Sequence, residues 1–170
     1  MARLLILLAV VLAIGIAEAR VRSFVFRRGV DVQACLDAHN SFRAQHGAEP
    51  LKWDDYLAKH AQAWADTLAA KGGLSHSPQM EVSDREGENL AHAGSCPEAV
   101  AQWIGELAKY KKSGACTNPP VHAPEGTDQV TQLMWQTTTS VGVGIAGNVV
   151  VARYFPPGNF EAEYEFDVKC

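Results

Sequence analysis

The first regular pattern along the chain is a stripe of apolar and histidine side chains in residues 32–46. These side chains recur every three or four positions, which is the spacing of a helix with one buried face. Asp31 stands at the predicted start, where its carboxylate can cap free backbone N–H groups, and Gly47 ends the helix. We expect His39 and His46 to be hydrogen-bonded packing residues. The stripe consists of Val32, Cys35, Leu36, His39, Phe42 and His46.

The same spacing predicts two further helices. The second begins at Asp54 or Asp55 and ends at Gly72. The third begins at Ser95 or Cys96 and has a proline in its first turn. The inward side chains are Leu57, His60, Ala61, Trp64 and Leu68 in the second helix, and Val100, Trp103, Ile104 and Leu107 in the third.

The C-terminal part of the chain changes to the pattern of β-strands. Residues 141–146 and 149–155 are rich in valine and are joined by Gly147 and Asn148, a pair that is typical of a two-residue hairpin turn. A short helix is expected over residues 129–135, and the alternation in the final YEFDVKC predicts another edge strand. Helices first and a hairpin last indicate an α+β domain in which helices cover an antiparallel sheet.

The N-terminus has the pattern of a secretory signal peptide. Arg3 precedes an apolar run over residues 4–17, and Ala17-Glu18-Ala19 matches the small residues that signal peptidase recognises. We expect residues 1–19 to be a signal peptide, residues 20–30 a short leader and residues 31–170 one domain. The apolar run is shorter than the roughly 20 residues that span a bilayer, so no transmembrane anchor is predicted. The mature protein is expected to be secreted and extracellular.

The charge of the chain excludes one class of partner. The sequence has 15 Lys and Arg against 19 Asp and Glu, and its formal net charge is -4 at pH 7. Residues 1–19 hold one charge of each sign, Arg3 and Glu18, so the mature chain keeps this value. Binding of nucleic acid needs a clustered basic surface, and we therefore expect no nucleic acid partner.

Four cysteines enter an oxidising compartment in a secreted protein, where an even number favours two disulfides. Three pairings of four cysteines are possible. Cys96 and Cys116 bracket the third helix and are expected to close a local loop, which leaves Cys35 to bind Cys170. The spacing of the four residues contains no CxxC motif, which argues against a metal or redox site of that kind.

Six segments of the chain carry a resemblance to a known family. They are LDAHNSFRAQHGAEPLKWDDYLA, His76-Ser77, GENLA at residues 87–91, WIGELAKY, VTQLMWQTT at residues 130–138 and RYFPPGN at residues 153–159. In this order and spacing they resemble the CAP superfamily, the group that contains cysteine-rich secretory proteins, insect antigen 5 and plant pathogenesis-related proteins. The resemblance runs over residues 36–159.

The resemblance implies a three-layer α-β-α sandwich with a shallow central cleft. Relatives often place two histidines and two glutamates in that cleft, and the histidines can bind zinc. His76, Glu88 and Glu106 match the first histidine and the two glutamates, but Gln129 stands at the second histidine, in a segment that relatives usually read as GHFTQ. An amide is a weak ligand for zinc, so we expect no resident cofactor and only weak metal binding at His76.

Two alternatives for these four residues stay open. His92 follows Glu88 by one helical turn and His122 precedes Gln129, so either histidine is a candidate to complete a metal site. In the other alternative, Gln129 hydrogen-bonds both carboxylates and the cleft is a structural polar network without metal. The loop over residues 113–128 has no aromatic residue, so the sterol-binding loop of the family is poorly matched.

Two classes of function are compatible with this pattern. The first is a secreted, non-enzymatic binding protein that acts on an extracellular lipid, glycan or protein, with host defence as one setting. The second is a metal-dependent hydrolase in which a bound ion activates water and Glu88 or Glu106 is the general base. A metal-free hydrolase would use His76 as base and a hydroxyl nucleophile from Ser75, Ser77 or Thr131. We favour the binding protein and expect no enzymatic activity, because most members of the family have no established catalytic activity.

Overall fold

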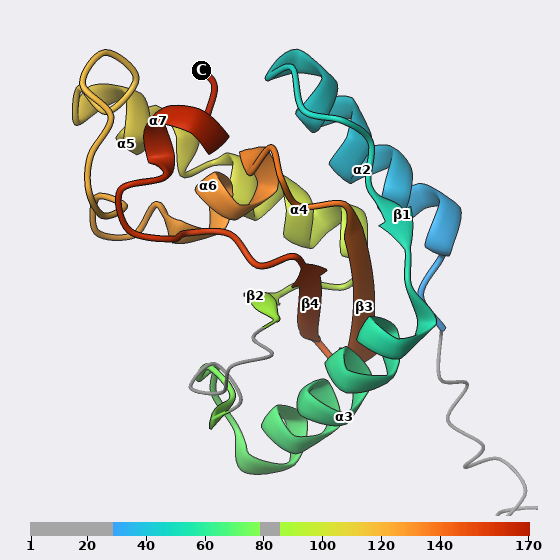
Figure 1. Ribbon diagram of the computed structural model, residues 1–170. Helices are drawn as coiled ribbons and strands as arrows, with labels where there is room; N and C mark the ends of the chain where they lie inside the picture. Colours follow the sequence, from blue (N-terminus) through green and yellow to red (C-terminus); the bar gives the residue numbers. More distant parts are fainter. Residues whose placement is uncertain (1–28, 79–85) are drawn as a thin grey trace, which may run out of the picture.

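The computed structural model describes residues 29–78 and 86–170, so the predicted signal peptide and most of the predicted leader lie outside the described residues. Helices lie on both sides of a small sheet (Figure 1). The helices are α2 Val32–Gln45, α3 Asp55–Lys71, α4 Cys96–Ile104, α5 Leu107–Lys112, α6 Asp128–Met134 and α7 Tyr164–Asp167. The strands are β1 Lys52–Trp53, β2 Gly87–His92, β3 Ser140–Ala146 and β4 Val149–Phe155.

The four strands form one sheet in the order β1-β3-β4-β2. β3 and β4 pair antiparallel as predicted, β2 pairs antiparallel with β4 as a strand that was not predicted, and β1 adds two residues that pair parallel with β3. The predicted hairpin of β3 and β4 is present, and Gly147 in its turn has a φ of 62°, which glycine adopts without steric cost. β2 is an edge strand of this sheet, and its outer side must be closed by other groups.

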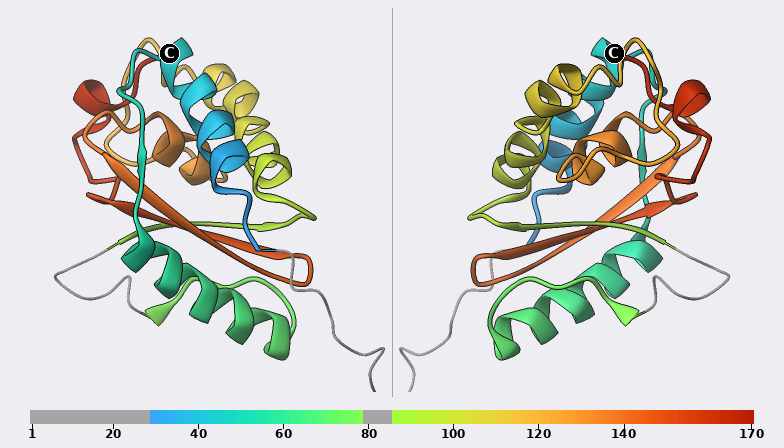
Figure 2. Two further views of the ribbon diagram at one scale, coloured as in Figure 1. Left: turned by 90° about the vertical axis from the view of Figure 1, so that its right-hand side faces the viewer. Right: turned by 90° about the vertical axis from the view of Figure 1, so that its left-hand side faces the viewer.

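The sheet is the middle of three layers. α3 covers one face, and α2, α4, α5 and α6 lie over the other (Figure 2). Gly142 and Gly144 of β3 lie directly against α3, where an added Cβ atom would collide with the backbone of Ala58 and Gln62. The absence of side chains at these two glycines lets α3 lie close to the sheet. These layers are the predicted three-layer α-β-α sandwich.

The predicted starts of the three long helices agree with the structure. The side chains of Asp31, Asp54 and Ser95 accept hydrogen bonds from backbone N–H groups in the first turns of α2, α3 and α4. No helix among the described residues is both long and apolar enough to cross a membrane.

Three polar side chains of α2 and its C-terminal cap residue are buried and hydrogen-bonded. Nδ1 of His39 lies 2.9 Å from the Cys35 carbonyl oxygen, and its Nε2 lies 3.0 Å from the hydroxyl of Tyr154. Nδ1 of His46 lies 2.7 Å from the Lys169 carbonyl oxygen. Both histidines are packing residues, as predicted. The third side chain, Arg43, is fully buried and donates to the carbonyl oxygens of Glu49, Leu133, Trp135 and Thr138.

The third predicted helix is interrupted. α4 ends at Ile104, and α5 begins at Leu107 after a turn at Gly105 and Glu106. The apolar spacing continues across the turn because Leu107 still packs against the core, so the spacing alone predicted one helix. The interruption places the Glu106 side chain against the start of α6.

The predicted disulfide pairing is wrong. The disulfides join Cys35 to Cys96 and Cys116 to Cys170. α2 and α4 pack against each other, which brings the Cα atoms of Cys35 and Cys96 to 5.3 Å. The predicted local loop fails because α4 and α5 separate Cys96 from Cys116, and a helix of nine residues alone is about 14 Å long.

The C-terminal segment is a helix and not the predicted edge strand. Tyr164 and Val168 are both buried, and their separation of four residues fits a helical turn as well as it fits alternation. Oδ1 of Asp167 accepts the N–H of Thr137 at 2.8 Å, and the disulfide of Cys170 follows. These tertiary contacts decide the local structure, and the short alternating pattern does not.

Candidate functional site

The candidate site consists of His76, Glu88, Glu106 and Gln129, and its first two members share a hydrogen bond. Nδ1 of His76 lies 2.7 Å from Oε1 of Glu88. Because an ionised carboxylate can only accept, Nδ1 carries the proton and Nε2 of the neutral ring keeps its lone pair. The Glu88 side chain is fully buried, whereas 59% of the His76 side chain is exposed. The hydrogen bond to Glu88 raises the pKa of His76 above its usual value.

Arg153 neutralises Glu88 from the neighbouring strand. The two residues are cross-strand partners in β2 and β4, and Nη2 of Arg153 lies 2.9 Å from Oε2 of Glu88. The same nitrogen donates to Oγ of Ser77 at 2.7 Å, and the N–H of Ser77 donates to Oε1 of Glu88 at 3.0 Å. These bonds hold the segment of His76 and Ser77 against the sheet.

A second histidine and glutamate, which the sequence did not predict as site residues, lie on the other side of Arg153. Nη1 of Arg153 lies 3.5 Å from Oε2 of Glu86, and Oε1 of Glu86 lies 2.7 Å from Nδ1 of His60. His60 comes from α3, where its ring packs against Tyr56 with 4.1 Å between centroids. The sequence feature that could have identified Glu86 is its spacing from Glu88, because residues two apart in an extended chain point to the same face.

Glu106 caps the start of α6. Its Oε2 accepts the backbone N–H groups of Gln129 and Val130 at 3.1 Å, and its Oε1 accepts Nε2 of Gln129 at 3.2 Å. Burial raises the pKa of Glu106, while the three hydrogen bonds act in the opposite direction because they favour the ionised form. This carboxylate has the structural role that one of the sequence-based alternatives described.

The side chain of Gln129 also closes the open edge of β2. Its Oε1 accepts the N–H of Leu90 at 2.8 Å, and Nε1 of Trp103 donates to the Leu90 carbonyl at 2.9 Å. Both outward-facing backbone groups of Leu90 are therefore satisfied. In the described part of the chain, Gln129 bonds the carboxylate of Glu106 but not that of Glu88, so the prediction that it bonds both is correct for one only.

The donor set of the candidate site does not fit a zinc ion, which needs three or four converging ligands. Both amide atoms of Gln129 and both oxygens of Glu106 are engaged in hydrogen bonds. Glu88 uses one oxygen for His76 and Ser77 and the other for Arg153. Nε2 of His76 is the donor atom that these contacts leave open. Weakened zinc binding remains a prediction, and these hydrogen bonds support it.

The two histidines that were candidates to complete a metal site have other surroundings than predicted. His92 is in β2 and not on a helix, so its four-residue separation from Glu88 corresponds to about 13 Å of extended chain and not to one helical turn. Nδ1 of His122 lies 3.7 Å from Glu161, and both of these side chains are largely exposed. Neither position supports the role of a missing ligand.

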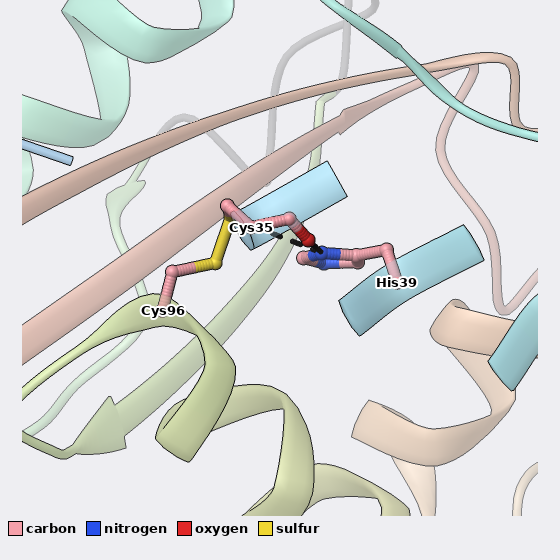
Figure 3. Close-up of side chains that lie close together, drawn as sticks. All are labelled: Cys35, His39 and Cys96. Carbon is pink, nitrogen blue, oxygen red and sulfur yellow. Dashed lines mark hydrogen bonds between the residues drawn. A yellow bond between two sulfur atoms is a disulfide. The ribbon is translucent and has the colours of Figure 1, made fainter. Parts of the chain in front are cut away.

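Within residues 29–78 and 86–170, one group of three potential metal ligands lies close together: Cys35, His39 and Cys96 (Figure 3). The two sulfur atoms are bonded to each other in a disulfide, so neither is a thiolate. Nδ1 of His39 faces a carbonyl oxygen, which can only accept, and therefore carries a proton. This group belongs to the packed core and not to a metal site.

The fold is similar to that of several solved structures. BmVAL-1 aligns with a TM-score of 0.64 and 23% identity, over 80% of this chain and 81% of that chain. Schistosoma mansoni venom allergen-like protein 4 has a TM-score of 0.55 and 23% identity, over 76% of this chain and 93% of that chain. NaASP2, in a crystal structure with Zn²⁺, has a TM-score of 0.57 and 21% identity, over 80% and 84%. At these identities the likeness shows the fold alone.

Several curated proteins have a higher sequence identity to this chain than these solved structures have. Pathogenesis-related protein 1A of Nicotiana tabacum is 37% identical over 141 residues, which are 77% of this chain and 78% of that protein. Golgi-associated plant pathogenesis-related protein 1 of Homo sapiens is 36% identical over 141 residues, which are 78% and 86%. The family model of CAP, the cysteine-rich secretory protein family, matches residues 36–151. The chain therefore belongs to the CAP family of cysteine-rich secretory proteins.

Proposed function

We propose that the protein is a secreted, non-enzymatic CAP-domain binding protein with a degenerate metal site, acting outside the cell on a lipid, glycan or protein. The hydrogen bonds of Gln129 carry this proposal. At the position of the family's second histidine, this residue joins α6 to the edge of β2 and to Glu106. A side chain held in this way stabilises the fold and offers no ligand to a metal ion.

The relatives support the setting of this function. CAP proteins are generally not enzymes, and the Nicotiana tabacum relatives are named pathogenesis-related proteins. A protein with such relatives and an N-terminus that resembles a signal peptide is suited to a defence role outside the cell.

Two of the three candidate hydroxyl nucleophiles have contacts that also favour binding over hydrolysis. Oγ of Ser77 accepts a hydrogen bond from Arg153, so it is directed to the guanidinium and not to an imidazole base. Oγ1 of Thr131 lies 2.7 Å from Oδ1 of Asn159 and also bonds the carbonyl of Thr127. A nucleophilic hydroxyl must instead lie within hydrogen-bond reach of its base.

Hydrolysis assays test the non-enzymatic part of the proposal. The purified mature chain is incubated with soluble esters and with phospholipid vesicles, in the presence of excess zinc and, separately, of a chelator. We expect no turnover above the rate without protein in either condition. Zinc-dependent turnover that is abolished by Glu106→Gln but kept by Glu98→Gln would contradict the proposal and favour the metal-dependent hydrolase.

Binding assays test the other part. The same protein is titrated with neutral vesicles, anionic vesicles and an immobilised panel of glycans, and extracellular proteins are tested by cross-linking. We expect saturable binding to one of these classes that is weakened by His76→Ala, because this ring is the exposed member of the candidate site. Unchanged binding in His76→Ala would place the contact surface elsewhere on the domain and contradict a role for the candidate site.

A further inference from the structure

Five ionisable side chains form a continuous row from α3 to the candidate site. We call this group the relay and define it as His60, Glu86, Arg153, Glu88 and His76. Successive members lie 2.7, 3.5, 2.9 and 2.7 Å apart. The relay is nearly symmetric about Arg153, because a carboxylate on each side contacts a histidine at its other oxygen. Only the half with His76 belongs to the candidate site.

The three central members are buried, and their charges do not cancel. The side chains of Glu86, Arg153 and Glu88 are 9%, 2% and 0% exposed. Two carboxylates and one guanidinium carry a net charge of -1, and buried charge is stabilised only by close partners. Among the described residues, Nη2 of Arg153 donates a hydrogen bond to Ser77, while Nε and Nη1 are buried without a hydrogen-bond partner. The orientation of the guanidinium therefore depends on the carboxylates on its two sides.

This geometry divides the two oxygens of Glu88 between two partners. Arg153 contacts Oε2, and Oε1 remains available to His76. A guanidinium without a second carboxylate tends to bind a single carboxylate through both oxygens at once. If Glu86 did not attract Nη1, Arg153 would turn fully toward Glu88 and compete with His76 for Oε1.

We propose that Glu86 and His60 are positioning residues of the candidate site. Glu86 attracts Nη1 of Arg153 and so keeps this side of the guanidinium away from Glu88. His60 fixes the orientation of the Glu86 carboxylate through the hydrogen bond to its Oε1. The result is a His76 ring fixed by its Nδ1–H bond to Glu88, with Nε2 directed away from that bond. Through the relay, the α3 layer sets the orientation of a residue on the far side of Arg153. This role is independent of the partner that the site binds.

The tautomer of His76 tests the proposal. Nitrogen NMR of the histidine rings, at a pH where all rings are neutral, reports which ring nitrogen carries the proton. In the native protein we expect His76 to be mainly in the Nδ1–H form. In Glu86→Gln we expect His76 to lose its preference for the Nδ1–H form. Its ring should shift toward the mixture of the two neutral tautomers that the exposed ring of His92 shows in the same spectrum. Zinc or partner binding does not enter this measurement, so its outcome is separate from that of the proposed function.

Two further variants make the test decisive. His60→Phe keeps a ring against Tyr56 but removes the bond to Glu86, and it should shift the His76 tautomer in the same direction to a smaller extent. It also serves if Glu86→Gln does not fold. Glu98→Gln is the matched control, because Glu98 accepts the N–H of Gly94 outside the relay, and it should leave His76 unchanged. A native His76 tautomer in both relay variants, with only a lower melting temperature, would overturn the proposal.

Discussion

Gln129 and Glu106 are joined twice, through the side-chain amide at 3.2 Å and through the backbone N–H of Gln129 at 3.1 Å. The amide oxygen of Gln129, Oε1, accepts a hydrogen bond from the N–H of Leu90 at 2.8 Å. One residue thus connects the turn after α4, the start of α6 and the open edge of β2. The bonds that give Gln129 this structural role also occupy the atoms with which a metal ligand would act.

Gln129→Leu should therefore destabilise the protein. The apolar side chain leaves the Leu90 N–H without its acceptor and removes one of the three hydrogen bonds to the Glu106 carboxylate, at a cost of about 1–3 kcal/mol. Urea unfolding measures this cost as a lower midpoint. Gln45→Leu is the control, because Gln45 is exposed and its amide donates to the Ser41 carbonyl of its own helix, and it should change stability by less than about 0.5 kcal/mol. Equal effects of the two variants would remove the structural role of Gln129.

Arg43→Met should be among the most damaging single substitutions. The guanidinium is fully buried and donates to four backbone carbonyls, which methionine cannot satisfy. We expect a loss of about 4 kcal/mol in the free energy of unfolding, and Arg43→Lys should recover only part of it because its ammonium lacks the planar fork. Lys71→Met, at an exposed cation over Trp64, should be nearly neutral. A mild effect of Arg43→Met would show that other groups satisfy the carbonyls.

His39 should make the fold sensitive to acid. Burial lowers its pKa from 6.5 to about 4, so between these values the unfolded chain binds a proton that the folded chain does not. Stability then falls as the pH decreases from 6.5 to 4, by about 3 kcal/mol over the whole window. Urea unfolding across this range measures the slope, and His39→Gln should flatten it. A slope that is the same in His39→Gln would contradict this assignment.

The corrected disulfides make a prediction about covalent structure and stability. Mass spectrometry of unreduced peptides should find Cys35 linked to Cys96 and Cys116 linked to Cys170. Replacing both Cys116 and Cys170 by serine opens a loop with a sequence separation of 54 residues, which corresponds to about 4 kcal/mol in the chain-entropy model. Peptides that link Cys96 to Cys116 would show that the observed packing of α2 against α4 is incorrect.

Much of the fold could be predicted from local sequence. Asp31, Asp54 and Ser95 mark helix starts because their side chains cap backbone groups within three residues, and Gly147-Asn148 marks the hairpin for a similarly local reason. The disulfides and α7 were predicted wrongly because they depend on how distant elements pack. No local pattern records that α2 lies against α4.

The candidate site shows the same division. The motifs identified His76, Glu88, Glu106 and Gln129, but the partners of these residues come from other elements. Arg153 meets Glu88 through the register of β2 and β4, and His60 reaches Glu86 from α3. The helical reading of Glu88 and His92 failed because a strand with apolar neighbours on both faces lacks the alternation that identifies a half-buried strand.

The central claim is that Gln129 has replaced a metal ligand, and zinc titration by calorimetry tests it most directly. The mature chain, Gln129→His and His76→Ala are titrated at near-neutral pH, where imidazoles are mostly neutral. We predict weak or absent binding by the native chain and by His76→Ala, and an affinity at least about tenfold higher, or 1.4 kcal/mol, in Gln129→His. Tight zinc binding by the native chain that is lost in His76→Ala would contradict the claim, and so would the lack of any gain in Gln129→His.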